Sequence, residues 1–112
     1  MKIYVIGNGL VGNVIAKDLN ENHDVTVYDL NINNKVDGIR YIKFNILEDD
    51  IAILNKAEII VLAVPGSIAF KALERIIPLG KKIVDISFFP ESALLLNDLA
   101  IKHNTQLIVD LT

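Results

Sequence analysis

The feature that most constrains this chain is a glycine-rich turn close to its amino end. Residues 3–6 form a short apolar run, and the pattern G-x-G-x-x-G follows at once at Gly7, Gly9 and Gly12. Helix-forming sequence comes next, and a β-branched run within residues 24–29 ends in Asp29. This order predicts a strand, a tight turn, a helix and a second parallel strand that ends in an acid.

Each glycine of this pattern has a separate physical role in a nucleotide-binding turn. Gly7 permits the sharp turn, Gly9 lets a pyrophosphate approach the backbone, and Gly12 lets the helix lie close to the sheet. The helix start offers unpaired N–H groups to the phosphates. Asp29 is predicted to accept hydrogen bonds from the adenosine ribose and to repel a 2′-phosphate, so NAD is favoured and NADP disfavoured. The alternative is a tight strand–helix connection that holds no ligand.

The rest of the chain alternates between strand-like and helix-like segments. Strands are expected at residues 2–6, 24–29, 39–44, 58–64, 82–86 and 106–111, and helices at 10–21, 48–56, 67–78 and 91–104. Such alternation predicts an α/β fold with a doubly wound parallel sheet, strand order 3-2-1-4-5-6 and right-handed crossovers. Residues 1–112 are expected to form one NAD(P)-binding domain.

Helix faces and one connection carry further expectations. Each of two helices is predicted to bury one apolar stripe. In the first helix the stripe consists of Val11, Val14, Ile15 and Leu19. In the helix at 67–78 it consists of Ile68, Ala72, Leu73, Ile76 and Ile77. Residues 31–38 are too short and too rich in turn formers for the usual crossover helix. One sheet face is therefore expected to be partly uncovered there, and it is the candidate contact of a homodimer.

Ligand is expected across the carboxyl ends of the first and fourth strands, where the strand order reverses. The loops at that edge are residues 7–12, 64–66 and 87–90. The residues predicted to bind the cofactor are Gly7, Asn8, Gly9, Leu10, Val11, Gly12, Asp29, Leu30, Asn45, Ala63, Val64 and Pro65.

Composition excludes several classes of function. The sequence has no cysteine, which rules out disulfides and thiolate metal sites and suits a reducing cytoplasm. The net charge is −3 and no basic stripe is present, so nucleic acid is not an expected partner. The longest apolar run covers residues 59–64, too short to insert into a membrane.

The sequence is poor in candidates for catalysis, and no catalytic residue or metal site is predicted. His23 and His103 are interpreted as surface residues at a turn and near a helix end. Asp85 is expected to bind backbone amides of nearby loops, with a role as a base as the alternative, and Ser87 is expected at the cofactor edge. Two aromatic residues follow, Phe88 and Phe89, and they are expected to pack under a nicotinamide, under a further domain, or into the core.

With these residues in place, the chain resembles the saccharopine dehydrogenase family, including its lysine 6-dehydrogenase-like members. The similarity lies in G-N-G-L-V-G-N-V-I-A-K-D-L from residue 7, V-P-G and A-F-K at 64–66 and 69–71, V-D-I-S-F-F-P-E at 84–91, and I-V-D at 108–110. The resemblance implies the NAD(P)-binding Rossmann domain of an oxidoreductase that acts on the C–N bond of lysine or saccharopine. The family usually continues D-A-G into its catalytic domain, whereas this chain reads D-L-T at 110–112.

That departure predicts NAD binding with little or no turnover by this chain alone, whether it is an excerpt of a longer enzyme or a free-standing remnant. A homodimer or a separate catalytic subunit is the expected protein partner. A second hypothesis is an NAD(H)-sensing regulatory domain resembling those of potassium-uptake regulators. A third is an assembly module that has lost its ligand.

Overall fold

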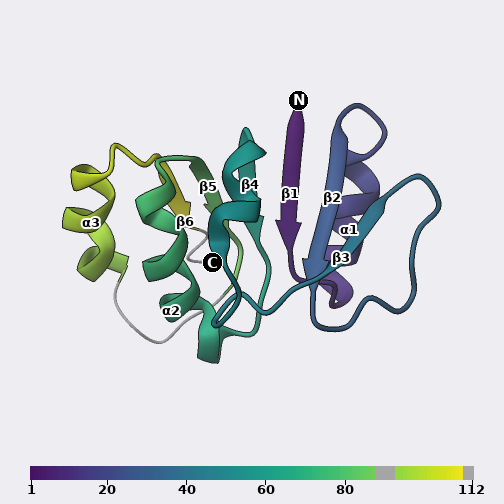
Figure 1. The fold of residues 1–112 in the computed structure, drawn as a ribbon, viewed down its shortest axis with the longest axis horizontal. Helices are drawn as coiled ribbons and strands as arrows, with labels where there is room; N and C mark the ends of the chain where they lie inside the picture. The colour runs from purple at the N-terminus through teal and green to yellow at the C-terminus, as the bar shows by residue number, and fades with distance from the viewer. Residues whose placement is uncertain (88–92, 110–112) are drawn as a thin grey trace.

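A parallel six-stranded sheet forms the centre of the fold (Figure 1). The structure is a computed structural model that describes residues 1–87 and 93–109. The strands are β1 (Lys2–Ile6), β2 (Asp24–Asp29), β3 (Arg40–Lys43), β4 (Ile59–Leu62), β5 (Lys82–Asp85) and β6 (Leu107–Val109). Their spatial order is β3-β2-β1-β4-β5-β6, and each neighbouring pair is parallel. The predicted fold class and strand order are confirmed.

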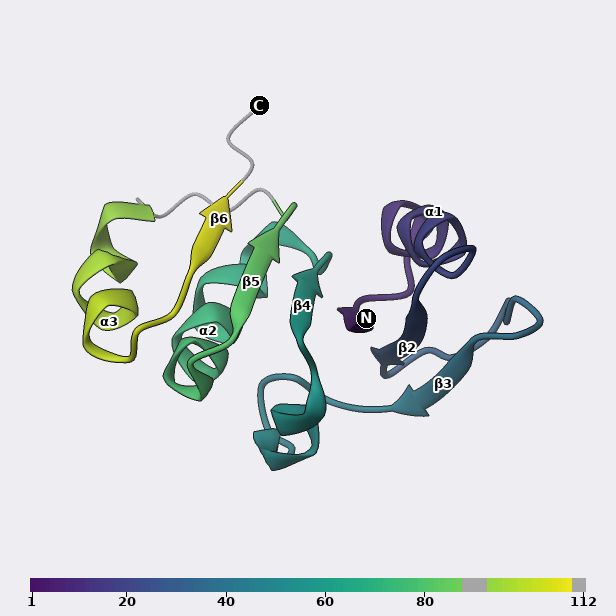
Figure 2. The same ribbon diagram turned by 90° about the horizontal axis from the view of Figure 1, so that it is seen from above.

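Helices lie on both faces of the sheet (Figure 2). The α-helices are α1 (Leu10–Leu19), α2 (Gly66–Ile76) and α3 (Asn97–Lys102), and the 3-10 helices are η1 (Ile51–Lys56), η2 (Ile77–Leu79) and η3 (Ala93–Leu96). Helix α1 covers one face near β1 and β2, whereas α2 and α3 cover the opposite face near β4, β5 and β6. Within the described ranges, no helix combines the length and the apolar character needed to cross a membrane.

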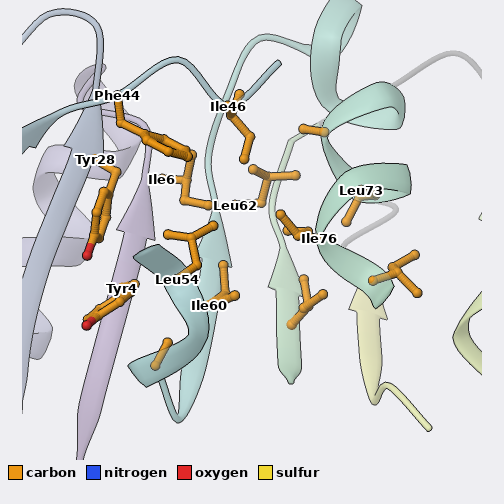
Figure 3. Close-up of a cluster of buried hydrophobic side chains, with 14 of the residues drawn as sticks. Tyr4, Ile6, Tyr28, Phe44, Ile46, Leu54, Ile60, Leu62, Leu73 and Ile76 are labelled. Atoms are coloured by element: carbon orange, nitrogen blue, oxygen red, sulfur yellow. The ribbon is translucent and has the colours of Figure 1, made fainter. Parts of the chain in front are cut away.

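Alternate residues of the strands supply two hydrophobic cores, one on each face. On β1, Tyr4 and Ile6 point to the α2 face, and Ile3 and Val5 point to the α1 face. The larger core joins the sheet to η1 and α2 and is shown in Figure 3; its labelled members are Tyr4, Ile6, Tyr28, Phe44, Ile46, Leu54, Ile60, Leu62, Leu73 and Ile76. Each fully buried Leu or Ile contributes about 1.5–3 kcal/mol, so this core fixes α2 against β4 and β5.

Helix α1 buries only part of the predicted stripe. Ile15 and Leu19 are half-buried and pack against the core on this face of the sheet, as predicted. Val11 and Val14 are 58% and 52% exposed, so their assignment to the buried face was wrong. The buried residues of α1 are Gly12 and Ala16. Small residues let the helix backbone approach the sheet closely, and this close contact decides which face turns inward. The predicted inward face of α2 is correct, since Ala72, Leu73, Ile76 and Ile77 are fully buried and Ile68 lies against the core.

The predicted helix at 48–56 is shorter and of another type. The 3-10 helix η1 begins only at Ile51, after Asp50. The Asp50 carboxylate accepts a hydrogen bond from the Ala52 amide at 2.9 Å, and the Asp49 carboxylate accepts one from the Asn45 amide at 2.8 Å. These local side-chain bonds compete with regular helix formation.

Other boundaries differ at element ends. Helix α1 ends at Leu19 and not at residue 21, and α2 gives way at Ile77 to η2, which contains Pro78. The predicted helix at 91–104 is a 3-10 turn followed by α3, and residues 91 and 92 lie outside the described ranges. The strands β3 to β6 are shorter than predicted by one to three residues at one or both ends within the described part.

The connection from β2 to β3 contains no helix, as its sequence predicted. It turns through left-handed backbone at Asn34 (φ 58°) and Gly38 (φ 86°). The Val36 amide donates to the Tyr41 hydroxyl oxygen at 2.8 Å, which holds the loop against β3. The dimer contact proposed for this region stays a prediction.

Candidate functional site

A cavity of about 610 Å³ lies where the carboxyl ends of β1 and β4 meet. The loops after β1, β2, β4 and β5 all contribute to it. Its lining residues are Asn8, Gly9, Leu10, Val11, Gly12, Asp29, Asn31, Ala63, Val64, Pro65, Gly66, Ile86 and Ser87. The sheet therefore gathers the glycine turn and Asp29 at its switch point, the place where open α/β sheets bind ligands.

The glycine turn is packed tightly at two of its three glycines. Gly7 has φ +120°, and a Cβ there would overlap the carbonyl oxygen of Ala63. A Cβ on Gly12 would overlap the carbonyl oxygen of Gly7. Both positions therefore require glycine for the fold itself.

Gly9 is different, because a Cβ built on it would meet no atom within 4 Å. It faces the cavity and caps α1 with extended backbone (φ −76°, ψ −168°). No described side chain caps this helix start, and its first turn has no acidic residue. The first amides of α1 are therefore left to a ligand, and the helix dipole favours an anionic one.

Asp29 stands at the end of β2 with both carboxylate oxygens engaged by backbone amides. Oδ2 accepts from the Asn8 amide at 2.5 Å, and Oδ1 accepts from the Asn31 amide at 2.8 Å. The side chain is half-buried and lines the cavity. Because a carboxylate has about four acceptor sites, it retains capacity for two hydroxyl groups while its orientation is fixed.

Asn8 joins the glycine turn to the loop after β2. Its side-chain amide donates to the Asn31 carbonyl at 3.1 Å and to the Asn33 carbonyl at 2.9 Å. The Asn33 amide in turn donates to the Asn31 side-chain oxygen at 3.0 Å. Sequence reasoning did not select Asn31 or Asn33, although an asparagine-rich run after a strand is a signal of such Asx turns.

A second cavity of about 230 Å³ lies beside the first and shares Asp29, Val64 and Pro65 with it. Its other lining residues are Ile6, Gly7, Tyr28, Leu30, Phe44, Asn45, Ile46 and Ile68. These walls are mainly apolar and suit a flat ring such as a base. The residues of this lining that were not among those predicted to bind the cofactor are Ile6, Tyr28, Phe44, Ile46 and Ile68. The loop that carries Ile46 is held by Arg75, whose Nη1 donates to the Ile46 carbonyl at 2.6 Å.

Asp85 and Ser87 brace the far wall of the larger cavity. The buried Asp85 carboxylate accepts from the Ser87 amide at 3.0 Å, which confirms the predicted bond to a loop amide. The Ser87 hydroxyl accepts from the Val64 amide at 2.8 Å and donates to the Leu62 carbonyl at 3.3 Å. These bonds tie the ends of β4 and β5 together. The predicted aromatic contacts of Phe88 and Phe89 lie outside the described residues.

All twelve residues predicted to bind the cofactor line one cavity or the other. His23 and His103 line neither of them. A separate cavity of about 470 Å³ between α3 and β6 shares no residue with this pair. Among the described residues, no three His, Asp or Glu side chains are grouped as a metal site would require.

Sheet order, glycine turn and switch-point cavity together define a Rossmann-type domain, the fold of dinucleotide-dependent dehydrogenases. No family model matches the sequence, and no curated protein sequence is significantly similar to it. The solved structures similar to this chain include a saccharopine dehydrogenase, as the resemblance predicted.

That structure is the L-Glu-forming saccharopine dehydrogenase of Saccharomyces cerevisiae. Its sequence is 18% identical and the TM-score is 0.81; the match covers 98% of this chain and 27% of the yeast protein. The enzyme GenD2 of gentamicin A biosynthesis, solved with NAD, has 18% identity and a TM-score of 0.75 over 97% of this chain and 34% of its own. An NAD-dependent formate dehydrogenase of Staphylococcus aureus, also solved with NAD, has 17% identity and a TM-score of 0.68. The match covers 97% of this chain and 34% of that enzyme. The chain thus spans about a third or less of these proteins, and the likeness is one of fold.

Proposed function

We propose that this chain is the NAD-binding domain of a cytoplasmic oxidoreductase and that it binds the dinucleotide across Gly9 and Asp29. The observation that carries the proposal is the open helix start at Gly9, with free amides on one side and a fixed carboxylate on the other. The diphosphate would accept from the first amides of α1. The adenosine ribose would donate to Asp29, and the adenine would occupy the smaller apolar cavity.

NAD is preferred over NADP in this proposal. Among the described residues that line the larger cavity, Asp29 is the only ionisable one, so none of them would neutralise a 2′-phosphate. Two of the solved neighbours contain NAD, which supports a dinucleotide of this kind.

The substrate class is proposed to be an amino acid whose C–N bond is oxidised or reduced, as the likeness to saccharopine dehydrogenase suggests. Hydride transfer needs the substrate carbon held against the nicotinamide, and the lining that the structure describes offers no general acid or base apart from Asp29. A second domain or a catalytic subunit would supply the other wall of the cleft. The chain alone is therefore expected to bind cofactor and to turn over little or no substrate.

Calorimetric titration with NAD, NADH, NADP and ADP-ribose tests this proposal. We expect NAD, NADH and ADP-ribose to bind and NADP to bind more weakly. Absence of binding by all four at millimolar concentration would overturn the proposed function, and a preference for NADP would overturn the role of Asp29. An NAD(H)-sensing domain would also bind, but it would change shape between NAD and NADH, which small-angle scattering with each ligand would reveal.

A further inference from the structure

The Asn8 bridge, which we define as Asn8 with the backbone of Asn31 and Asn33, connects segments more than twenty positions apart in the sequence. It adds two side-chain hydrogen bonds to the one that the Asn8 amide donates to Asp29. The loop after β2 is thus attached to the glycine turn through one residue. The first part of the loop otherwise makes short-range Asx contacts within residues 29–33, and its second part is held to β3 by the bond from the Val36 amide to the Tyr41 hydroxyl.

We propose that Asn8 is a positioning residue that holds this loop, and with it Asp29, in the ribose-binding arrangement before a dinucleotide arrives. This inference rests on the proposed function. It goes further by naming the residue that sets the preference for NAD over NADP. Asn8 acts through the backbone of the loop, whereas Asp29 contacts the ribose.

The Asn8 bridge is proposed to affect the choice of cofactor because it holds the loop in a conformation in which the backbone amides already have acceptors. The amide of Asn31 donates to Asp29, and the amide of Asn33 donates to the Asn31 side chain. Neither amide is therefore free to receive a 2′-phosphate while the bridge is closed. The Asp29 carboxylate meanwhile keeps its orientation, so that a phosphate on the ribose would meet fixed negative charge.

Loss of the bridge should affect the two cofactors unequally. In Asn8→Ala the loop gains freedom, so NAD must order it on binding and loses about 5- to 10-fold in affinity, the effect of one or two hydrogen bonds. NADP should lose less, because the freed loop can withdraw the carboxylate and release amides toward the phosphate. The ratio of NAD to NADP affinity should therefore fall, by up to about 5- to 10-fold where the affinity for NADP is unchanged.

Asn13→Ala is the matched control. Asn13 lies on the first turns of α1, outside both cavities, and takes no part in the bridge, while its amide bond to the Gly9 carbonyl survives the change. Asn8→Leu is the second variant: it has nearly the same shape, adds no charge beside Asp29, and has no side-chain N–H to donate. If Asn8 only filled space, Asn8→Leu would keep the hydrogen-exchange protection of the loop.

The experiment combines titration of NAD and NADP with amide hydrogen exchange of the ligand-free protein. We expect faster exchange at Asn31 and Asn33 in both Asn8 variants, a reduced NAD to NADP ratio in Asn8→Ala, and no change in Asn13→Ala. If wild-type protein binds NAD while Asn8→Ala keeps the wild-type ratio and exchange, the bridge has no positioning role and the proposed function stands. If wild-type protein binds no NAD, the proposed function fails and this inference fails with it.

Discussion

A pair of alanine substitutions in the glycine turn separates what the fold needs from what a ligand needs. In Gly9→Ala the added methyl group enters open space, since no atom lies within 4 Å of its position. In Gly12→Ala the methyl group would overlap the carbonyl oxygen of Gly7, which α1 can relieve only by moving away from the sheet. The two changes are chemically identical and lie three residues apart.

The expected stability changes follow from these surroundings. At Gly9 the backbone is extended with φ −76°, which alanine adopts readily. Because alanine has less conformational entropy than glycine in the unfolded chain, the substitution should stabilise the folded protein by about 0.4–1 kcal/mol. Alanine is a poorer helix cap than glycine by about the same amount, so the melting temperature should shift by less than about 3 °C. Gly12→Ala should cost about 1–3 kcal/mol through overpacking, which lowers the melting temperature by roughly 5–15 °C.

The effect on NAD affinity should be larger for Gly9→Ala than for Gly12→Ala, the reverse of the order for stability. The Gly9 methyl group would lie between the amides of α1 and the diphosphate, so NAD affinity should fall by at least about 10-fold, or about 1.4 kcal/mol. Thermal melts without ligand and calorimetric NAD titrations below the melting range measure both effects. Wild-type NAD affinity in a folded Gly9→Ala protein would refute the reasoning, because the diphosphate would then not pass over Gly9.

Three further changes test other parts of the site and core. Asp29→Ala should weaken NAD binding by about 1–3 kcal/mol in a titration, the loss expected for hydrogen bonds to a charged acceptor; unchanged affinity would show that Asp29 does not bind the ribose. Ser87→Ala should lower the free energy of unfolding by about 1–3 kcal/mol in urea, because the Val64 amide loses its acceptor, whereas exposed Ser67→Ala should have little effect. Burial raises the pKa of the Tyr28 hydroxyl above its ordinary 10.0, so the folded state keeps a proton that the unfolded chain releases. Stability should therefore fall above about pH 10 by up to about 1.4 kcal/mol per pH unit, and Tyr28→Phe should reduce this slope in alkaline urea titrations.

The sheet could be predicted from sequence because its signals are local. Apolar runs bounded by turn residues gave β1 and β2 with their observed bounds, residues 2–6 and 24–29. The handedness of parallel crossovers then restricts the strand order, and the glycine turn identifies the switch point. The candidate site followed from the same rules, since carboxyl ends of parallel strands meet at one edge.

What the sequence did not predict depends on contacts between distant segments. Helix α1 has apolar residues on more than one face, and the close approach at Gly12 decides that Val11 and Val14 stay exposed. The bonds from Asn8 to the loop after β2 likewise join residues that no periodicity relates. Local acid–amide bonds around Asp50 shortened a helix that the pattern alone extended.

The two outer strands of the sheet would meet an incoming strand very differently. Strand β3 reads Arg40-Tyr41-Ile42-Lys43, with an exposed cation at each end. Strand β6 reads Leu-Ile-Val over 107–109 and carries no charge. Lysine and arginine on an outer strand discourage edge-to-edge association, because another chain would have to bury or displace the charges. Lengthening of the sheet is therefore expected beside β6, and the β3 border is expected to resist aggregation.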